Sequence, residues 1–137
     1  MIDRQTVQNG FDAVLQATLS AAPAVAFLYD NQEDVSLSTG TAPYVRMRVN
    51  FNFDDQVHLG NQGYRRQEGS ILLFIHVRTN TGPLARNQIV DRLTRAFRST
   101  YIAPATTFDA QVLPSTRTEN WEITAVRIPF YFDNPRG

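Results

Sequence analysis

Two carboxylates and an imidazole lie within five residues of one another, at Asp54, Asp55 and His58. Side chains of these types can bind a divalent metal ion. A hard cation needs more oxygen ligands than these residues supply, and a trio of this kind in a loop is usually solvated. We therefore predict no metal site and no bound cofactor.

The second histidine, His76, alternates with aliphatic residues on a predicted strand. Acid–base catalysis needs a partner within hydrogen-bond reach, and the nearby sequence supplies none. The sequence holds no nucleophile elbow, no phosphate-binding loop and no zinc-protease helix motif, and it contains no cysteine. We predict that the protein is not an enzyme and that His76 is a packing or interface residue.

The charges of the chain cancel, with 13 basic and 13 acidic residues. No overall field therefore attracts nucleic acid or an anionic membrane. Every basic residue is arginine. Arginine suits protein interfaces better than lysine does, although the codon composition of the genome explains the bias equally well.

A long polar segment, "HLGNQGYRRQEG", precedes the most apolar stretch of the chain. A hairpin needs only about two to five linking residues, so we interpret this segment as a loop with a further role. Gly60, Gly63 and Gly69 permit turns, and no helix follows Gly60 and Gly63 to form a phosphate cradle. Tyr64, Arg65 and Arg66 are of the residue types in which interface energy concentrates.

Hydrophobic spacing indicates the elements that position these residues. Apolar residues at helical spacing predict a helix over residues 4–21, with Asp3 as its cap and Pro23 beyond its end. A short strand is predicted at 24–29 and a loop at 30–41. Alternation then predicts strands at 43–53 and 70–79. On the second of these strands, Leu72 and Phe74 lie opposite the main apolar face, which indicates cover on both faces or contact with another chain.

The second half of the chain predicts one helix and two strands. Residues 84–99 form an amphipathic helix with arginines at positions 86, 92, 95 and 98, either solvated or in contact with phosphate. Strands are predicted at 107–114 and 121–132. Pro129 places the last one at a sheet edge or a bulge.

Together these elements predict a single domain over residues 1–137 with an α+β fold. We expect a mainly antiparallel sheet of four or five strands packed by two helices, in the order helix-strand-strand-helix-strand-strand. No apolar stretch approaches the ~20 residues of a membrane-spanning helix, so we expect a soluble protein without a membrane partner.

The order of several segments resembles a known family. "GYRRQEG", "ILLFIHV", "TNTGPLA", "IVDRLTRAF" and "WEITAVRIPFYFDN" together resemble the phage tail terminator, or tail completion, proteins of the lambda minor tail protein U type. The resemblance covers most of residues 43–133, together with the N-terminal helix.

The resemblance implies a structural virion protein that forms a hexameric ring on the end of the tail tube. The ring stops tube elongation and presents the surface that joins the filled head. Its implied partners are further copies of the chain, the major tail tube protein and a head-completion or stopper protein, while DNA passes through the lumen without specific binding. The implied location is the neck end of the virion tail, with assembly in the host cytoplasm.

A closed ring consists of heterologous contacts, in which one patch of each subunit meets a different patch of its neighbour. The residues expected at the subunit or tube interface are those of the polar segment and the second apolar face: Gly60, Gly63, Tyr64, Arg65, Arg66, Leu72 and Phe74.

Three alternative functions stay open at this stage. Another head–tail connector protein, an adaptor or stopper, would also assemble as a ring and would differ mainly in its place in the stack. A small ligand-binding or hydrolytic α+β domain would use Asp54, Asp55, His58 and His76 in a closed pocket. A nucleic-acid-binding module would use the arginines of the second helix.

Overall fold

The computed structural model describes residues 3–29, 32, 34–52, 55–56 and 64–135. In chain order the elements are α1 (Arg4–Ser20), β1 (Ala26–Leu28), α2 (Val35–Thr39), β2 (Tyr44–Phe51), β3 (Asp55–Gln56), β4 (Tyr64–Arg78), α3 (Leu84–Phe97), β5 (Tyr101–Ile102), β6 (Ala105–Thr107), β7 (Gln111–Val112), β8 (Thr116–Arg117) and β9 (Trp121–Pro135).

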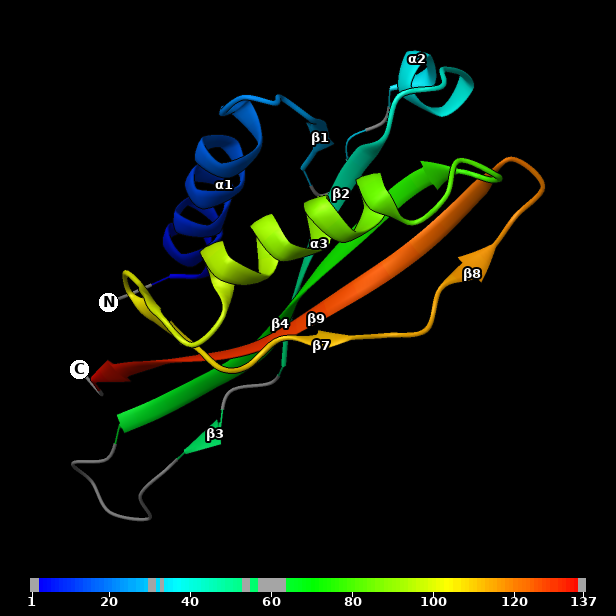
Figure 1. Cartoon of the computed structure of the whole chain (residues 1–137). Coiled ribbons are helices and arrows are strands. Elements are labelled where there is room, and N and C mark those ends of the chain that lie inside the picture. The colour runs from blue at the N-terminus through cyan, green and yellow to red at the C-terminus, as the bar shows by residue number, and fades with distance from the viewer. Residues whose placement is uncertain (1–2, 30–31, 33, 53–54, 57–63, 136–137) are drawn as a thin grey trace.

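The described strands form one nine-stranded sheet in the order β1-β2-β4-β9-β6-β5, with β3 paired to β4 and with β7 and β8 paired to β9. β1 and β2 are parallel, and every other pair is antiparallel. β4 and β9 pair along all 15 residues of each strand. Figure 1 shows them as two long, twisted strands behind α1 and α3.

The predicted fold class is therefore wrong. The sheet is mixed and curled and has nine strands, so it is not a four- or five-stranded antiparallel sheet packed by two helices. Five of the strands, β3 and β5 to β8, have only two or three residues each. Segments this short show no alternation of apolar and polar residues from which a strand could be predicted. In addition, residues 64–69 belong to β4, although the sequence predicted them as loop.

The N-terminal helix forms as the sequence predicted. The carboxylate of Asp3 accepts a hydrogen bond from the backbone N–H of Thr6 at 2.8 Å, which caps α1. Its buried residues follow the predicted spacing: Val7, Phe11, Leu15 and Leu19. None of the helices in the described part of the chain is long and apolar enough to cross a membrane.

The core lies between α1, α3 and one face of β2, β4 and β9. Residues that pair across these strands share that face, as in the row Met47, Leu73 and Val126. All three side chains are fully buried. The rings of Phe11 on α1 and Phe130 on β9 meet edge to face with centroids 4.9 Å apart, which joins helix and sheet.

Two residues of the sheet have roles that the sequence did not predict. Gly69 does not turn a loop but pairs within β4, and a Cβ atom there would lie 2.2 Å from the carbonyl oxygen of Asn50. Pro129 lies on an inner strand, so its predicted place at an edge is wrong. Its carbonyl accepts a hydrogen bond from the N–H of Phe108, and its missing donor falls between the pairings of β6 and β7.

The predicted loop at 30–41 contains the short helix α2. The carboxylate of Asp34 caps it by accepting hydrogen bonds from the N–H and the hydroxyl of Ser36 at 3.0 and 2.6 Å. Five residues are too few for a periodic signal, because one helical turn already takes 3.6 residues.

Candidate functional site

One face of the sheet faces away from α1 and α3, and we call it the open face. Side chains of a strand alternate between the two faces, so the strand register assigns each residue to a face. Across β2, β4 and β9 the open face consists of these rows: Tyr44, His76 and Ile123; Arg46, Phe74 and Ala125; Arg48, Leu72 and Arg127; Asn50, Ser70 and Pro129. β4 and β9 continue it with Glu68 and Tyr131, and with Arg66 and Asp133.

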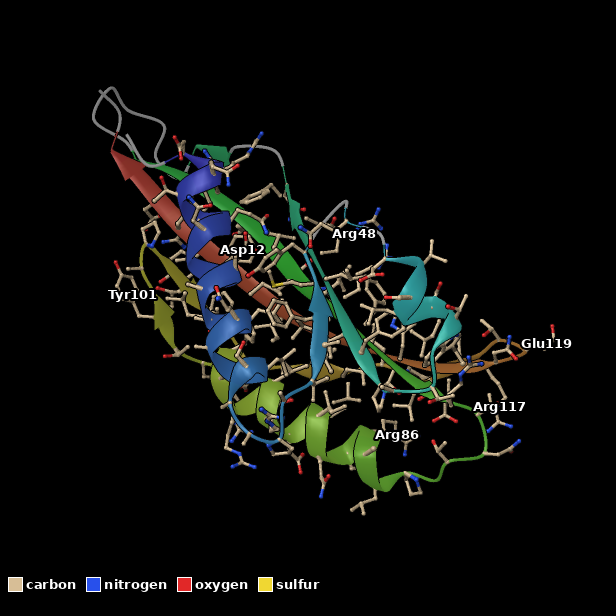
Figure 2. All side chains as sticks on the ribbon, turned by 90° about the horizontal axis from the view of Figure 1, so that it is seen from above. Asp12, Arg48, Arg86, Tyr101, Arg117 and Glu119 are labelled. Carbon is tan, nitrogen blue, oxygen red and sulfur yellow. The ribbon has the colours of Figure 1, made fainter. Side chains whose placement is uncertain are left out.

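The middle of the open face combines apolar and cationic side chains. Leu72 and Phe74 are partly buried, and Arg46, Arg48 and Arg127 flank them on the neighbouring strands. Figure 2 shows Arg48 on the side of β2 away from α1. The prediction that Leu72 and Phe74 lie opposite the main apolar face is confirmed.

The arginines of these middle rows lack carboxylate partners. Within the described residues, neither Arg46 nor Arg48 forms an ion pair, and Arg127 donates only a long hydrogen bond of 3.5 Å to the amide oxygen of Gln111. Guanidinium groups next to half-covered apolar side chains match the composition of interface centres, where arginine and aromatic residues are enriched. The middle rows can therefore bind an acidic surface with apolar side chains.

Aromatic side chains occupy one end of the open face. The rings of Tyr44 and His76 stack with centroids 4.3 Å apart, and Trp121 contacts Tyr44 edge to face at 5.2 Å. Burial lowers the pKa of His76 below its ordinary value, and the charge of Arg46 lowers that pKa further. His76 is thus a neutral packing residue, which agrees with its predicted role.

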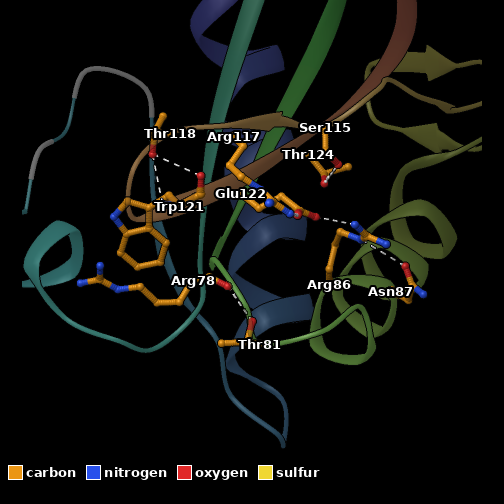
Figure 3. Close-up of polar contacts among 10 residues, drawn as sticks. All are labelled: Arg78, Thr81, Arg86, Asn87, Ser115, Arg117, Thr118, Trp121, Glu122 and Thr124. Carbon is orange, nitrogen blue, oxygen red and sulfur yellow. Dashed lines mark hydrogen bonds and ion pairs between the residues drawn. The ribbon is translucent and has the colours of Figure 1, made fainter.

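Arg78 and Trp121 hold α2 against this end of the sheet, and we call this pair the clamp. Arg78 donates hydrogen bonds to the carbonyl oxygen of Gly40, at 2.9 Å from its Nε, and to that of Thr39. The indole Nε1 of Trp121 donates to the carbonyl oxygen of Ser38 at 3.2 Å. The guanidinium carbon lies 4.5 Å from the centre of the indole ring, and Figure 3 shows the two side chains together.

At the opposite end of the open face, Arg66 contacts other residues of its own chain. Its Nε lies 2.9 Å from a carboxylate oxygen of Asp133, and its guanidinium carbon lies 4.4 Å from the centre of the Tyr131 ring. Phe108 packs beside that ring with centroids 5.5 Å apart. Arg66 therefore already has partners within its own chain, and its expected place at a subunit or tube interface stays a prediction.

The other residues of the predicted interface lie at the edge of the described structure. The backbones of Tyr64 and Arg65 belong to β4 and pair with Pro135 and Asn134, so their placement in a loop is wrong. Gly60 and Gly63 lie outside the described residues, and so do Asp54 and His58 of the acidic trio.

Of the residues predicted for a hydrolytic pocket, Asp55 and His76 are described, and they do not lie together. Asp55 pairs with Arg66 near one end of β4, whereas His76 lies near the other end. Ten residues of strand separate those positions by about 33 Å. No group of three potential metal ligands occurs among the described residues.

The arginines of α3 are partly engaged in the fold. Arg86 forms an ion pair with Glu122, which also pairs with Arg117 at 3.2 Å (Figure 3). These cations hold the pKa of the Glu122 carboxyl below its ordinary value. Arg92 donates to three carbonyl oxygens at the end of α1, those of Thr18, Ala21 and Pro23. A continuous phosphate-binding face on this helix is therefore not supported.

The larger hollows do not gather catalytic groups. One of 490 Å³ lies between α3 and the segments at the starts of β1 and β2, and small apolar residues line it together with Asp91, Arg92 and Arg95 of α3. Another, of 610 Å³, is lined by hydroxyl residues of β5 and β6, together with Phe108 and Asp109. Neither brings an imidazole together with a carboxylate.

The comparisons with known proteins concern the fold alone. No family model and no curated protein matches the sequence. One solved structure, whose name describes no function, covers 100% of this chain and 99% of its own at a TM-score of 0.71 and 11% sequence identity. It is one of 19 chains of solved structures that match. At that identity the similarity concerns the fold alone, so any argument about function has to start from the residues of the open face.

Proposed function

We propose that the protein is a phage tail terminator, a structural virion protein that forms a ring on the end of the tail tube. The order of its segments supports this proposal, since the strand "ILLFIHV", the helix "IVDRLTRAF" and the closing strand resemble that family. The observation that carries the proposal is the open face, where Leu72 and Phe74 lie partly buried between arginines that form no ion pair within the described part of the chain.

The mechanism is assembly by surface burial. Covering the apolar rows of the open face removes hydrocarbon from water, which drives association. Carboxylates of a partner can pair with Arg46, Arg48 and Arg127, which gives the contact its orientation. A ring that covers the last layer of tube subunits leaves no site for the next layer and supplies the surface for the head-completion protein.

DNA must pass such a ring without being held. Arg86 and Arg92 on α3 already have protein partners, and the arginines of the open face would be covered in the contact. Passage without tight binding fits a chain with zero net charge, because phosphate contacts dominate nucleic-acid affinity.

Electron microscopy of particles made by the parent phage without this gene tests the proposal. Overlong, headless tails are the expected result, because tube growth lacks its stop. Tails of normal length beside filled heads would instead identify an adaptor or stopper. Intact, infectious particles would contradict any role in tail assembly.

A further inference from the structure

The lateral edges of the sheet are poor sites for adding a strand from another chain. β1, at one edge, has only three residues. Beside β9, Pro114 separates β7 from β8, and a proline cannot donate a ladder hydrogen bond. These two edges therefore offer a neighbouring subunit less than the open face does, although residues 47–51 of β2 pair with no outer strand in the described part of the chain.

Charge is distributed unevenly between the open face and the first third of the chain. The middle rows of the open face contain three arginines and no carboxylate. Residues 5–45 contain four carboxylates and no basic residue. Among these carboxylates Asp34, at the start of α2, can complement the open face and lies on the chain itself, which favours a second copy as its partner.

Within that acidic third, α2 is the feature that projects. Val35 is 72% exposed, the highest value among the exposed large hydrophobic side chains of the described residues, and no residue of α2 is buried. Hydrogen bonds from Ser36 hold the pKa of the adjacent Asp34 carboxyl below its ordinary value, so this group is charged at neutral pH. The clamp fixes the other end of α2, so an exposed apolar side chain and a carboxylate are presented on a pre-organised element.

We propose that α2 of one subunit docks on the middle rows of the open face of the next subunit. In this contact Val35 packs against Leu72 and Phe74. The carboxylate of Asp34 lies beside the guanidinium groups of Arg46 and Arg48. The inference rests on the proposed function, since it names the two patches that meet in the ring.

The position of α2 makes this contact heterologous. α2 is clamped at the Tyr44 end of its own sheet, where Leu37 packs against the aromatic residues. Figure 1 shows α2 beyond the end of β2 at which that strand begins, so α2 lies at one end of the sheet rather than over its middle. Each subunit thus contributes α2 to one contact and the middle rows of its open face to another. Such heterologous contacts can close into a ring.

Disulfide trapping tests the contact directly, because the chain has no cysteine of its own. The double variant Val35→Cys with Leu72→Cys should give a ladder of cross-linked chains on a non-reducing gel after mild oxidation. Leu72→Cys alone should stay monomeric on that gel. Ala13→Cys with Leu72→Cys is the matched control, since Ala13 is exposed on α1, and it should give no ladder.

Light scattering on the same samples separates the two proposals. A ring without a ladder would overturn the docking of α2 and leave the ring intact. Dimers from Leu72→Cys alone would show open faces packed on one another and would also overturn it. A ladder combined with normal tails in the deletion strain would uphold the docking and overturn the terminator function. A single chain at every concentration would overturn the docking.

A charge variant tests the polar part of the contact without loss of the helix cap. Asp34→Asn keeps an N-cap of equal quality and removes the charge. It should weaken association about two- to fivefold at low salt, and less as salt rises. Asp91→Asn, an exposed carboxylate on α3, which covers the opposite face of the sheet, is the control and should change nothing. Equal effects of the two variants would overturn the role of Asp34.

Discussion

Consecutive residues of β4 lie in two different environments. Ile71, Leu73 and Ile75 face α1 and α3 and have no exposed surface, whereas Leu72 and Phe74 face away from these helices and are only partly buried. The same strand therefore has one face that its own chain covers and one face that its own chain leaves half-covered. The first face accounts for folding, and the second is free to account for association.

Truncation on the two faces should give the largest contrast. Leu73→Ala should lower the free energy of unfolding by about 2–5 kcal/mol, because it leaves a cavity in the core. Leu72→Ala should lower it by less, about 1–2 kcal/mol, because part of that side chain already meets water. Urea denaturation of both variants measures the difference. Equal losses would mean that the chain covers its open face after all.

Gly69 tests how closely the strands approach one another. Gly69→Ala should destabilise the protein by about 1–3 kcal/mol, because its Cβ would lie 2.2 Å from the carbonyl oxygen of Asn50 and 2.7 Å from the Phe130 ring. Ser70→Ala, one residue further along on the open face, should change stability by no more than about 0.5 kcal/mol. The urea midpoints of the two variants provide the measurement. A neutral Gly69→Ala would show that β2 can move away from β4 at little cost.

Two arginines of α3 extend the comparison to the helical side. Arg92→Ala should cost about 1–3 kcal/mol, because carbonyl groups at the end of α1 lose a charged donor. Arg95→Ala should cost at most about 0.5 kcal/mol, because its side chain is exposed. Thermal melting compares them. A larger loss for Arg95→Ala would contradict the stabilising role of the hydrogen bonds from Arg92 to the end of α1.

The pH dependence at His76 should give the smallest effect. Because burial lowers the pKa of His76 in the folded protein below its ordinary 6.5, the unfolded chain binds this proton first as the pH falls. The stabilising effect is complete above about pH 6.5 and decreases below it, until the folded pKa is reached. Melting temperatures between pH 7.5 and 5 should therefore fall, and less so in His76→Phe. An identical slope in that variant would assign the effect to other groups.

The sequence predicted the elements whose side chains repeat over several turns or alternate over several residues. α1 was recognised from Val7, Phe11, Leu15 and Leu19, and the two faces of β4 from Leu72 and Phe74 against Ile71 and Leu73. These patterns depend on burial by neighbouring helices, which leaves a signal at every second, third or fourth residue.

The parts that the sequence did not predict depend on contacts between distant residues. The clamp joins Arg78 and Trp121 to backbone carbonyls near residue 40, and such acceptors have no sequence signature. The strands β5 to β8 are held by pairing to one another or to β9 rather than by a pattern of their own. The extension of β4 back to Tyr64 depends on its pairing with Pro135. These features explain why the fold class was wrong while α1 and the faces of β4 were right.

The pairing of β4 with β9 has a consequence for the folding of the newly synthesised chain. The residues that pair lie between 43 and 71 positions apart, so this contact closes late and folding should be slow for a domain of this size. β9 is also synthesised after every other described element, yet it brings Phe130 and Phe132 into the core. While the ribosome still holds that strand, one edge of β4 has no partner and its apolar side chains are exposed. In the proposed ring, the contacts between subunits would therefore form only after β4 and β9 have paired.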